Sequence, residues 1–121
     1  TGIYVQYAQV RARKLISNLG VNEKPLSEPP LNLDLVDRKL VIALANIEFF
    51  LDLSLKYSEP HHLANYLYEI SNAFNAFYQG SNIKDITNIT EKNQKIIITN
   101  LFVQYSHLIM SCLGIKPVQN M

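Results

Sequence analysis

The chain has 121 residues, of which 48% are hydrophobic and 17% charged, and its formal net charge is only +1. This length suits a single domain, and the apolar content excludes an intrinsically disordered polar chain. The single cysteine, Cys112, excludes an internal disulfide and a thiolate zinc cluster, and we expect it to be an inert thiol in the core.

The first predicted helix occupies the N-terminal part of the chain. Apolar residues at helical spacing form one stripe there, namely Val5, Ala8, Ala12, Leu15 and Leu19. Gly20 is a typical C-terminal stop for such a helix. Three prolines between residues 21 and 31 exclude a helix and indicate a loop.

Two more helices are predicted after this loop. Asn32 or Asp34 caps the second one, and its apolar stripe is Leu40, Leu44, Ile47, Leu51 and Leu55. Residues 58–60 break it, and Pro60 suits the first turn of a third helix. The apolar stripe of that helix is Leu63, Leu67, Ile70, Phe74 and Phe77, and we expect it to end at Gly80.

The fourth predicted helix is the most apolar. We expect Thr90 to cap it, Glu91 to favour its first turn, and Gly114 to stop it after Leu113. Residues 96–115 carry no formal charge and are long enough to cross a bilayer, but six polar side chains among them favour a buried core helix. Together the four stripes predict an all-α fold, an antiparallel bundle of four main helices.

Signals for catalysis are poor. The sequence lacks a glycine-rich phosphate loop. His61 and His62 are adjacent, so we expect them to point to different helix faces and not to share a metal ion. His107 lies in an apolar helix, where we expect it to be partly buried. We therefore predict no catalytic site, no metal and no cofactor in this chain.

The most informative pattern is an aromatic stripe on the first helix. Tyr4, Tyr7 and Arg11 stand at i, i+3 and i+7, and Lys14 extends the stripe. Tyrosines beside a guanidinium can stack unpaired bases and hold a phosphate. The same pattern is also common at the boundary of an ordinary core, so the spacing alone leaves both interpretations open.

Three blocks of the sequence resemble the anticodon-binding (DALR) domain at the C-terminus of arginyl-tRNA synthetase. The first is Y-x-Q-Y-A-x-x-R at residues 4–11, the second is P-H-x-L-x-x-Y-L at residues 60–67 with Phe77-Tyr78, and the third is L-G-I-K at residues 113–116 with a terminal Met121. They have the family's order and spacing. Departures are Lys95-Ile96 in place of an Arg-Leu pair, Ile109 in place of a glycine, and Asn82 where some members have an aromatic residue.

This resemblance implies that residues 1–121 recognise the anticodon loop of an arginine tRNA. Family positions around that loop correspond here to Tyr4, Tyr7, Arg11, Tyr78 and Met121, and the role of Gln6 stays open. The resemblance also implies a cytoplasmic parent enzyme that uses ATP with magnesium. Its HIGH and KMSKS signatures are absent here, so we expect a separate catalytic domain upstream of Thr1 and interpret the chain as a C-terminal fragment of a longer synthetase. No membrane partner is expected.

Two alternatives remain at this stage. One is the related domain of the glycyl-tRNA synthetase beta chain, against which the L-G-I-K ending argues. The other is a helical protein-interaction module without an RNA role. Residues 1–20 contain three bases and no acid, and residues 84–116 contain four lysines and two acids, so that a polyanion would meet the chain ends rather than the middle. On charge alone, however, an ordinary soluble surface remains the favoured interpretation.

Overall fold

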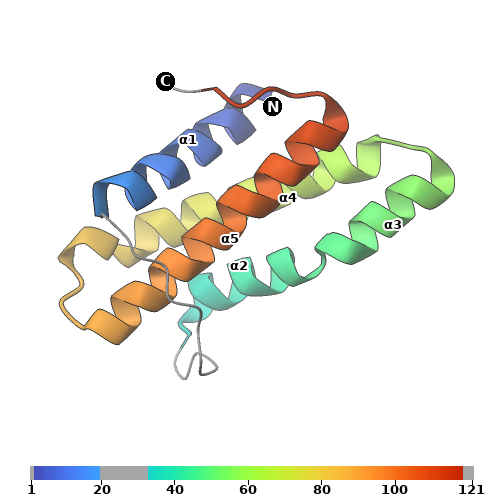
Figure 1. The fold of residues 1–121 in the computed structure, drawn as a ribbon. Coiled ribbons are helices and arrows are strands. Elements are labelled where there is room, and N and C mark those ends of the chain that lie inside the picture. Colours follow the sequence, from blue (N-terminus) through green and yellow to red (C-terminus); the bar gives the residue numbers. More distant parts are fainter. Residues whose placement is uncertain (1, 20–32, 119–121) are drawn as a thin grey trace.

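The computed structural model describes residues 2–19 and 33–118, and throughout these residues the regular elements are helices. Figure 1 shows them in chain order. They are α1 (Gly2–Leu19), α2 (Leu35–Ala45), α3 (Ile47–Tyr57), α4 (His61–Ser81), the short 3-10 helix η1 (Ile83–Asp85) and α5 (Ile89–Leu113). The predicted all-α bundle is confirmed.

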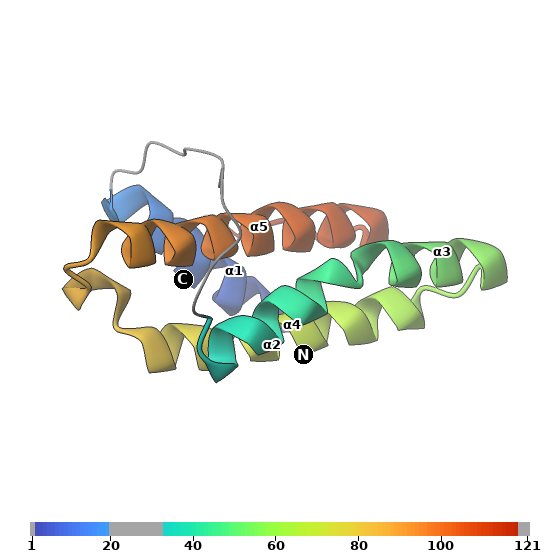
Figure 2. The same cartoon turned by 90° about the horizontal axis from the view of Figure 1, so that it is seen from below.

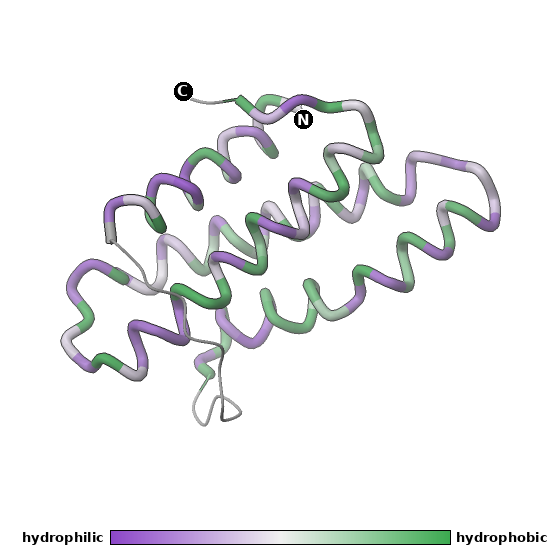
Figure 3. The backbone as a smooth tube through the Cα atoms, in the orientation of Figure 1, coloured by the Kyte–Doolittle hydropathy of each residue, from purple (hydrophilic) through white to green (hydrophobic). Residues whose placement is uncertain are grey.

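Helix α4 lies at the centre of the bundle and packs against all the other α-helices. Helix α1 lies on one side of the α4–α5 pair, and α2 and α3 follow each other along the other side (Figures 1 and 2). Most residues of the predicted apolar stripes meet in one core, where the rings of Phe74 and Phe102 stack with centroids 4.5 Å apart. The prediction was wrong for Leu55, which is 80% exposed near the end of α3. The hydropathy changes every few residues along each helix, as amphipathic helices require (Figure 3).

The predicted second helix is interrupted, which the sequence did not indicate. Asn46 leaves the helical conformation with φ −87° and ψ 6°, so α2 ends at Ala45 and α3 begins at Ile47. The buried Tyr66 hydroxyl donates hydrogen bonds to the carbonyls of Ala43 and Leu44, at 2.5 and 3.3 Å. A tyrosine from α4 thus stabilises the break by binding carbonyls at the end of α2.

Side chains cap the beginnings of α2 and α5. Asp34 caps α2, as one of the two predictions stated, by accepting the N–H of Asp37 at 3.0 Å. The prediction for the last helix was wrong, because the N-cap is Asn88 and not Thr90. Asn88 accepts the N–H three residues later, and the helix therefore starts at residue 89.

The ends of α4 and α5 both use the left-handed conformation. Gly114 terminates α5 with φ +74°, as predicted, and Ile115 donates its N–H back to the carbonyl of Met110 at 2.8 Å. Helix α4 runs one residue past Gly80 to Ser81 and stops at Asn82, with φ +39°. The predicted stop at Gly20 lies outside the described residues, as does a cap at Asn32.

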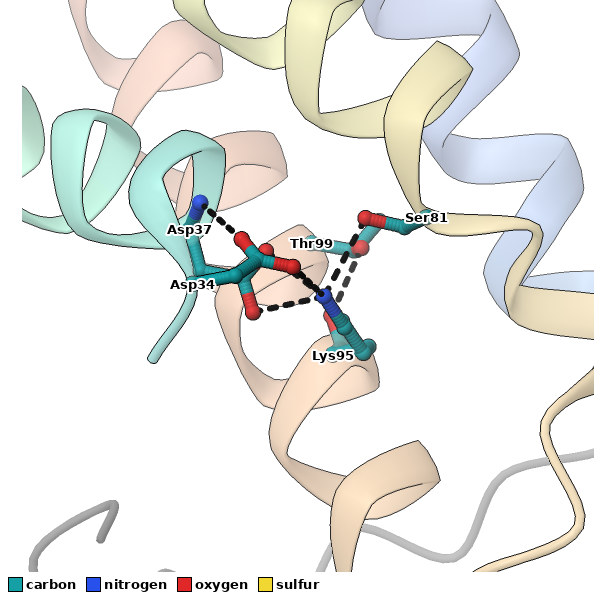
Figure 4. Close-up of polar contacts among 5 residues, drawn as sticks. All are labelled: Asp34, Asp37, Ser81, Lys95 and Thr99. Carbon is teal, nitrogen blue, oxygen red and sulfur yellow. Dashed lines mark hydrogen bonds and ion pairs between the residues drawn. The ribbon is translucent and has the colours of Figure 1, made fainter. Parts of the chain in front are cut away.

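A buried lysine joins three elements of the bundle (Figure 4). Lys95 of α5 places its ammonium 2.6 and 2.7 Å from the two carboxylate oxygens of Asp37, 3.3 Å from Asp34 and 3.2 Å from the hydroxyl of Ser81. Burial raises the pKa of Asp37, although Lys95 opposes this effect. Burial also acts on Asp34, but the N–H of Asp37 and the ammonium of Lys95 lower the Asp34 pKa overall.

Helix α5 is the one described helix long and apolar enough, by length and composition, to cross a membrane. In the bundle its buried positions, including Phe102, Ile109 and Met110, belong to the core, in line with the prediction of a core helix. Two expectations for this helix were wrong. Cys112 and His107 are both exposed, because they occupy the face of α5 that turns away from the bundle.

Candidate nucleic-acid interface

The first helix separates its core stripe from its aromatic stripe, as predicted. Val5, Ala8 and Ala12 are buried in the core, whereas Tyr7 on the neighbouring face is 43% exposed. This neighbouring face lies along α4, whose residues supply the partners of the aromatic stripe. Tyr7 is therefore accessible to a ligand, whereas Tyr4 is partly buried and packs against the edge of the core.

Arg11 lies between two tyrosine rings. Its guanidinium carbon is 4.6 Å from the ring centroid of Tyr7 and 4.5 Å from that of Tyr78, both within cation–π range. The same guanidinium donates hydrogen bonds to the Tyr7 hydroxyl at 2.8 Å and to the Asn75 side-chain oxygen at 3.2 Å. We call these residues, Tyr7, Arg11, Asn75 and Tyr78, the Arg11 cluster. The structure brings three predicted site residues together, and Asn75 joins them without having been predicted.

Tyr4 lies one helical turn away from the Arg11 cluster. Its hydroxyl donates to the side-chain oxygen of Asn72 at 2.5 Å, and its ring is 5.3 Å from that of Tyr68. Tyr68 is itself 43% exposed, so this second aromatic pair continues the surface along α1 and α4. Met121, the fifth predicted site residue, lies outside the described residues.

A hollow of about 330 Å³ opens beside the Arg11 cluster. Its walls come from α1 beyond its first turn, from the end of α4 and from η1. They are Tyr7, Val10, Arg11, Lys14, Leu15, Asn18, Tyr78 and Lys84. A second hollow of about 200 Å³ shares Tyr78 and Lys84 with the first and adds Asn82 and Asp85. The two adjoining hollows are thus lined by one exposed and one partly buried tyrosine ring, two amides, three cations and the carboxylate of Asp85.

The described part of the C-terminal tail is attached to α1. Gln6 donates from its side-chain nitrogen to the carbonyl of Lys116 at 3.2 Å, and the guanidinium of Arg13 donates to the carbonyl of Val118. Gln6 and Arg13 are seven residues apart, so both lie on one face of α1. Gln6, whose role the sequence left open, therefore helps to fix the tail along the same helix that carries Tyr7 and Arg11.

The prediction that His61 and His62 point to different faces was wrong. Their ring centroids are 4.0 Å apart, and a carboxylate oxygen of Glu59 lies 3.6 Å from His61 and 3.4 Å from His62. The three possible ligand atoms lie within 4.8 Å of one another at the exposed turn before α4. This group is at the opposite end of α4 from Tyr78, so it does not belong to the Arg11 cluster. The absence of a bound metal stays a prediction.

Comparison with known proteins identifies the family. Residues 5–121 match the model of the DALR anticodon binding domain. The chain belongs to this family. It is 32% identical over 122 residues to the arginine–tRNA ligase of Pasteurella multocida (strain Pm70), and 32% identical over 121 residues to that of Actinobacillus succinogenes (strain ATCC 55618 / DSM 22257 / CCUG 43843 / 130Z). These alignments cover 100% of the chain but only 22% and 21% of the relatives, so this DALR domain spans about a fifth of their length.

The departures from the family pattern now have a structural description. Lys95, which stands in place of an arginine, is the buried cation that joins α2, α4 and α5. Ile109, in place of a glycine, is fully buried and fills part of this DALR domain's core. Asn82, where some members have an aromatic residue, adopts the left-handed conformation at the end of α4 and lines the smaller hollow. Asn82 therefore places an amide in the wall of the smaller hollow.

Proposed function

We propose that this chain is the anticodon-binding domain of an arginine–tRNA ligase and that the anticodon loop binds at the Arg11 cluster and its hollow. The observation that carries the proposal is the Tyr7–Arg11–Tyr78 arrangement, with Tyr7 exposed and Arg11 and Tyr78 partly buried, beside an open hollow in a domain of the DALR family. Single-stranded RNA loops are recognised by proteins largely through bases that leave the stack and pack on aromatic side chains.

The genetic code defines which base such a site should read. Every arginine codon has G at its centre, so every arginine anticodon has a central C. A splayed cytosine stacked on the exposed Tyr7, with polar groups of the hollow at its edge, suits this requirement. Arg11 contributes by holding the two rings in place. We include Tyr4 and Met121 in the proposed site, Tyr4 as an adjoining aromatic surface and Met121 by its family position.

The chemistry of aminoacylation belongs, in this proposal, to a part of the protein that the 121 residues do not include. The relatives are about five times longer than this chain, and their name states that they join arginine to tRNA. A catalytic domain of the same polypeptide would bind ATP with magnesium and form the product. The partners are then an arginine tRNA and that catalytic domain, and the place of action is the cytoplasm, where tRNA is charged for translation.

The test compares tRNA affinity and melting for Tyr7→Ala and Tyr78→Ala. Stacking of one base on an aromatic ring is worth roughly 1–3 kcal/mol, so we expect binding to weaken about tenfold or more while the variants stay folded. Tyr57→Ala is the matched control, because Tyr57 is an exposed tyrosine at the end of α3. Each protein is also measured with a tRNA whose central anticodon C has been replaced.

The outcomes separate a recognition site from a structural surface. Folded Tyr7 and Tyr78 variants that bind the normal tRNA weakly and lose much of their preference for the central C support the proposal. Variants that keep both affinity and preference refute it. A loss of binding that only follows a loss of folding would show that the two tyrosines serve the core instead.

A further inference from the structure

We propose that Lys14 and Lys84, rather than Arg11, hold backbone phosphates of the RNA at the larger hollow. This inference rests on the proposed function, because it assigns roles within the same site. It differs from the expectation drawn from the sequence, in which the arginine of the aromatic stripe holds the phosphate. Two sets of contacts in the structure carry the inference, one at Arg11 and one at the lysines.

The guanidinium of Arg11 is already engaged within the protein. One terminal nitrogen donates to the Tyr7 hydroxyl and the other to the Asn75 side chain. Both Tyr7 and Tyr78 rings lie within 4.6 Å of its central carbon. These contacts use two of the five guanidinium N–H groups, one on each terminal nitrogen, and they fix the two rings relative to α1 and α4. A phosphate that bound both terminal nitrogens side by side would have to share them with Tyr7 and Asn75, whereas the two lysines make no such contacts within the described part of the chain. Arg11 is therefore a positioning residue for the tyrosines.

In contrast to the guanidinium of Arg11, the ammonium groups of Lys14 and Lys84 are not engaged by the residues that the structure describes. Lys14 follows Arg11 by three residues on α1, Lys84 lies in η1 beyond the end of α4, and both side chains are exposed and line the larger hollow. Among residues 2–19 and 33–118, neither ammonium makes an ion pair or a hydrogen bond. None of the described residues that line the larger hollow is acidic, so Lys14, Lys84 and Arg11 determine its charge, and the nearest carboxylate among the lining residues is Asp85 in the adjoining smaller hollow.

The position of the lysines fits an RNA backbone around an inserted base. They come from two different elements that line the same hollow as Tyr7 and Tyr78. A base that enters the hollow brings its flanking phosphates to the rim, where exposed ammonium groups can reach them. Lysine binds phosphate as a flexible point charge. Such contacts contribute affinity and orientation but carry no base information.

The experiment measures tRNA affinity as a function of salt for Lys14→Gln, Lys84→Gln and the double variant. Each lost phosphate contact should reduce the slope of log K against log salt by about 0.7 for single-stranded nucleic acid. We expect each single variant to bind more weakly, the double variant to lose about twice as much slope, and the preference for the central C to stay. Lys39→Gln is the control, because Lys39 is an exposed lysine on α2, across the α4–α5 pair.

Arg11→Lys provides the complementary variant, because it keeps the charge but cannot reproduce the two separate hydrogen bonds from the guanidinium to Tyr7 and Asn75. We expect it to weaken binding and the preference for C while leaving the salt slope unchanged, and melting shows whether it is folded. Arg11→Gln should behave in the same way if Arg11 touches no phosphate. A drop in slope for Arg11→Gln, with no drop for the lysine variants, overturns the inference.

The proposed function and this inference fail in different ways. If Tyr7→Ala binds normally, the anticodon site itself is wrong. If Tyr7→Ala binds weakly but the lysine variants keep the original affinity and slope, only the assignment of the phosphate contacts is wrong. An equal reduction of the slope in Lys39→Gln would also overturn it, because the effect would then reflect overall charge rather than contacts at the hollow.

Discussion

Replacement of Lys95 by methionine should destabilise the bundle severely. The ammonium of Lys95 is 2.6 Å from a carboxylate oxygen of Asp37, and the two side chains are only 5% and 4% exposed. Methionine fills a similar length of side chain but supplies no charge and no donor. The variant would leave Asp37 buried against an apolar group, and Ser81 would lose a donor.

The burial of the Lys95–Asp37 ion pair determines how much folding free energy the Lys95→Met variant should lose. An exposed ion pair contributes about 0–1 kcal/mol, whereas removal of one member of a buried pair costs about 3–5 kcal/mol, because the remaining charge is uncompensated. We expect the upper range here, since Asp37 keeps little access to water. In the variant the Asp37 pKa, already raised by burial, loses the opposing effect of Lys95 and rises further.

The pH dependence follows from the sign of that shift. A carboxyl group whose pKa is higher in the folded than in the unfolded chain binds more protons when folded. Its contribution to stability is therefore complete below the unfolded pKa, near the ordinary value of 3.8, and is lost as the pH rises through the folded pKa. The destabilisation of Lys95→Met should accordingly grow from acid to neutral pH.

Urea denaturation of the wild type and variants measures these free energies. Lys39→Met is the matched control on the exposed face of α2 and should change stability by less than about 0.5 kcal/mol. The double variant Asp37→Leu, Lys95→Met should recover much of the loss, because both charges are then removed. A cost below about 1 kcal/mol for Lys95→Met, or a double variant as unstable as the sum of the single ones, would refute the reasoning.

Four further outcomes are expected. Asn88→Ala should cost about 1 kcal/mol in urea denaturation by removing the cap of α5, whereas an unchanged midpoint would contradict the assigned cap. Tyr66→Phe should cost about 0.5–1.5 kcal/mol, because the Ala43 carbonyl loses its side-chain donor and keeps only the N–H of Asn46 at 3.2 Å, and a neutral effect would show that the break before α3 does not need the Tyr66 hydroxyl. The exposed Cys112 should react with a thiol reagent in the folded protein, and protection until unfolding would place it inside. Deletion of the last two residues, including Met121, should weaken tRNA binding with little change in melting, and unaltered binding would remove Met121 from the site.

Most of the fold could be predicted because each helix is encoded by residues that are close together in the sequence. Apolar stripes at helical spacing and the prolines and glycines between them depend on neighbouring residues only. The break at Asn46 could not be predicted in this way, because Tyr66, which contributes to it, lies 20 residues further along the chain. The burial of Lys95 could not be predicted for the same reason. A charged residue within an apolar helix looks like a surface position until Asp37 and Ser81 are known to converge on it.

In the candidate site, too, local spacing could be predicted from the sequence, whereas contacts between elements could not. The i, i+3, i+7 spacing identified Tyr4, Tyr7 and Arg11 as one face, and the family resemblance added Tyr78. Spacing could not show that Arg11 turns toward Asn75, because that contact depends on how α1 packs on α4. It also could not show that Lys84 reaches the hollow, since η1 comes to α1 only through the turn after α4.

The helical period explains why α1 can serve several purposes without conflict. Val5, Ala8 and Ala12 face the core, Gln6 and Arg13 hold the tail, and Tyr7 and Arg11 face α4 and the hollow. Since all these groups stand on one rigid helix, its packing fixes the distance between the tail and the tyrosines. A larger side chain at the fully buried Ala8 or Ala12 would therefore displace α1 as a unit. Such a change should disturb the tail and the Arg11 cluster together, even though Ala8 and Ala12 belong to neither.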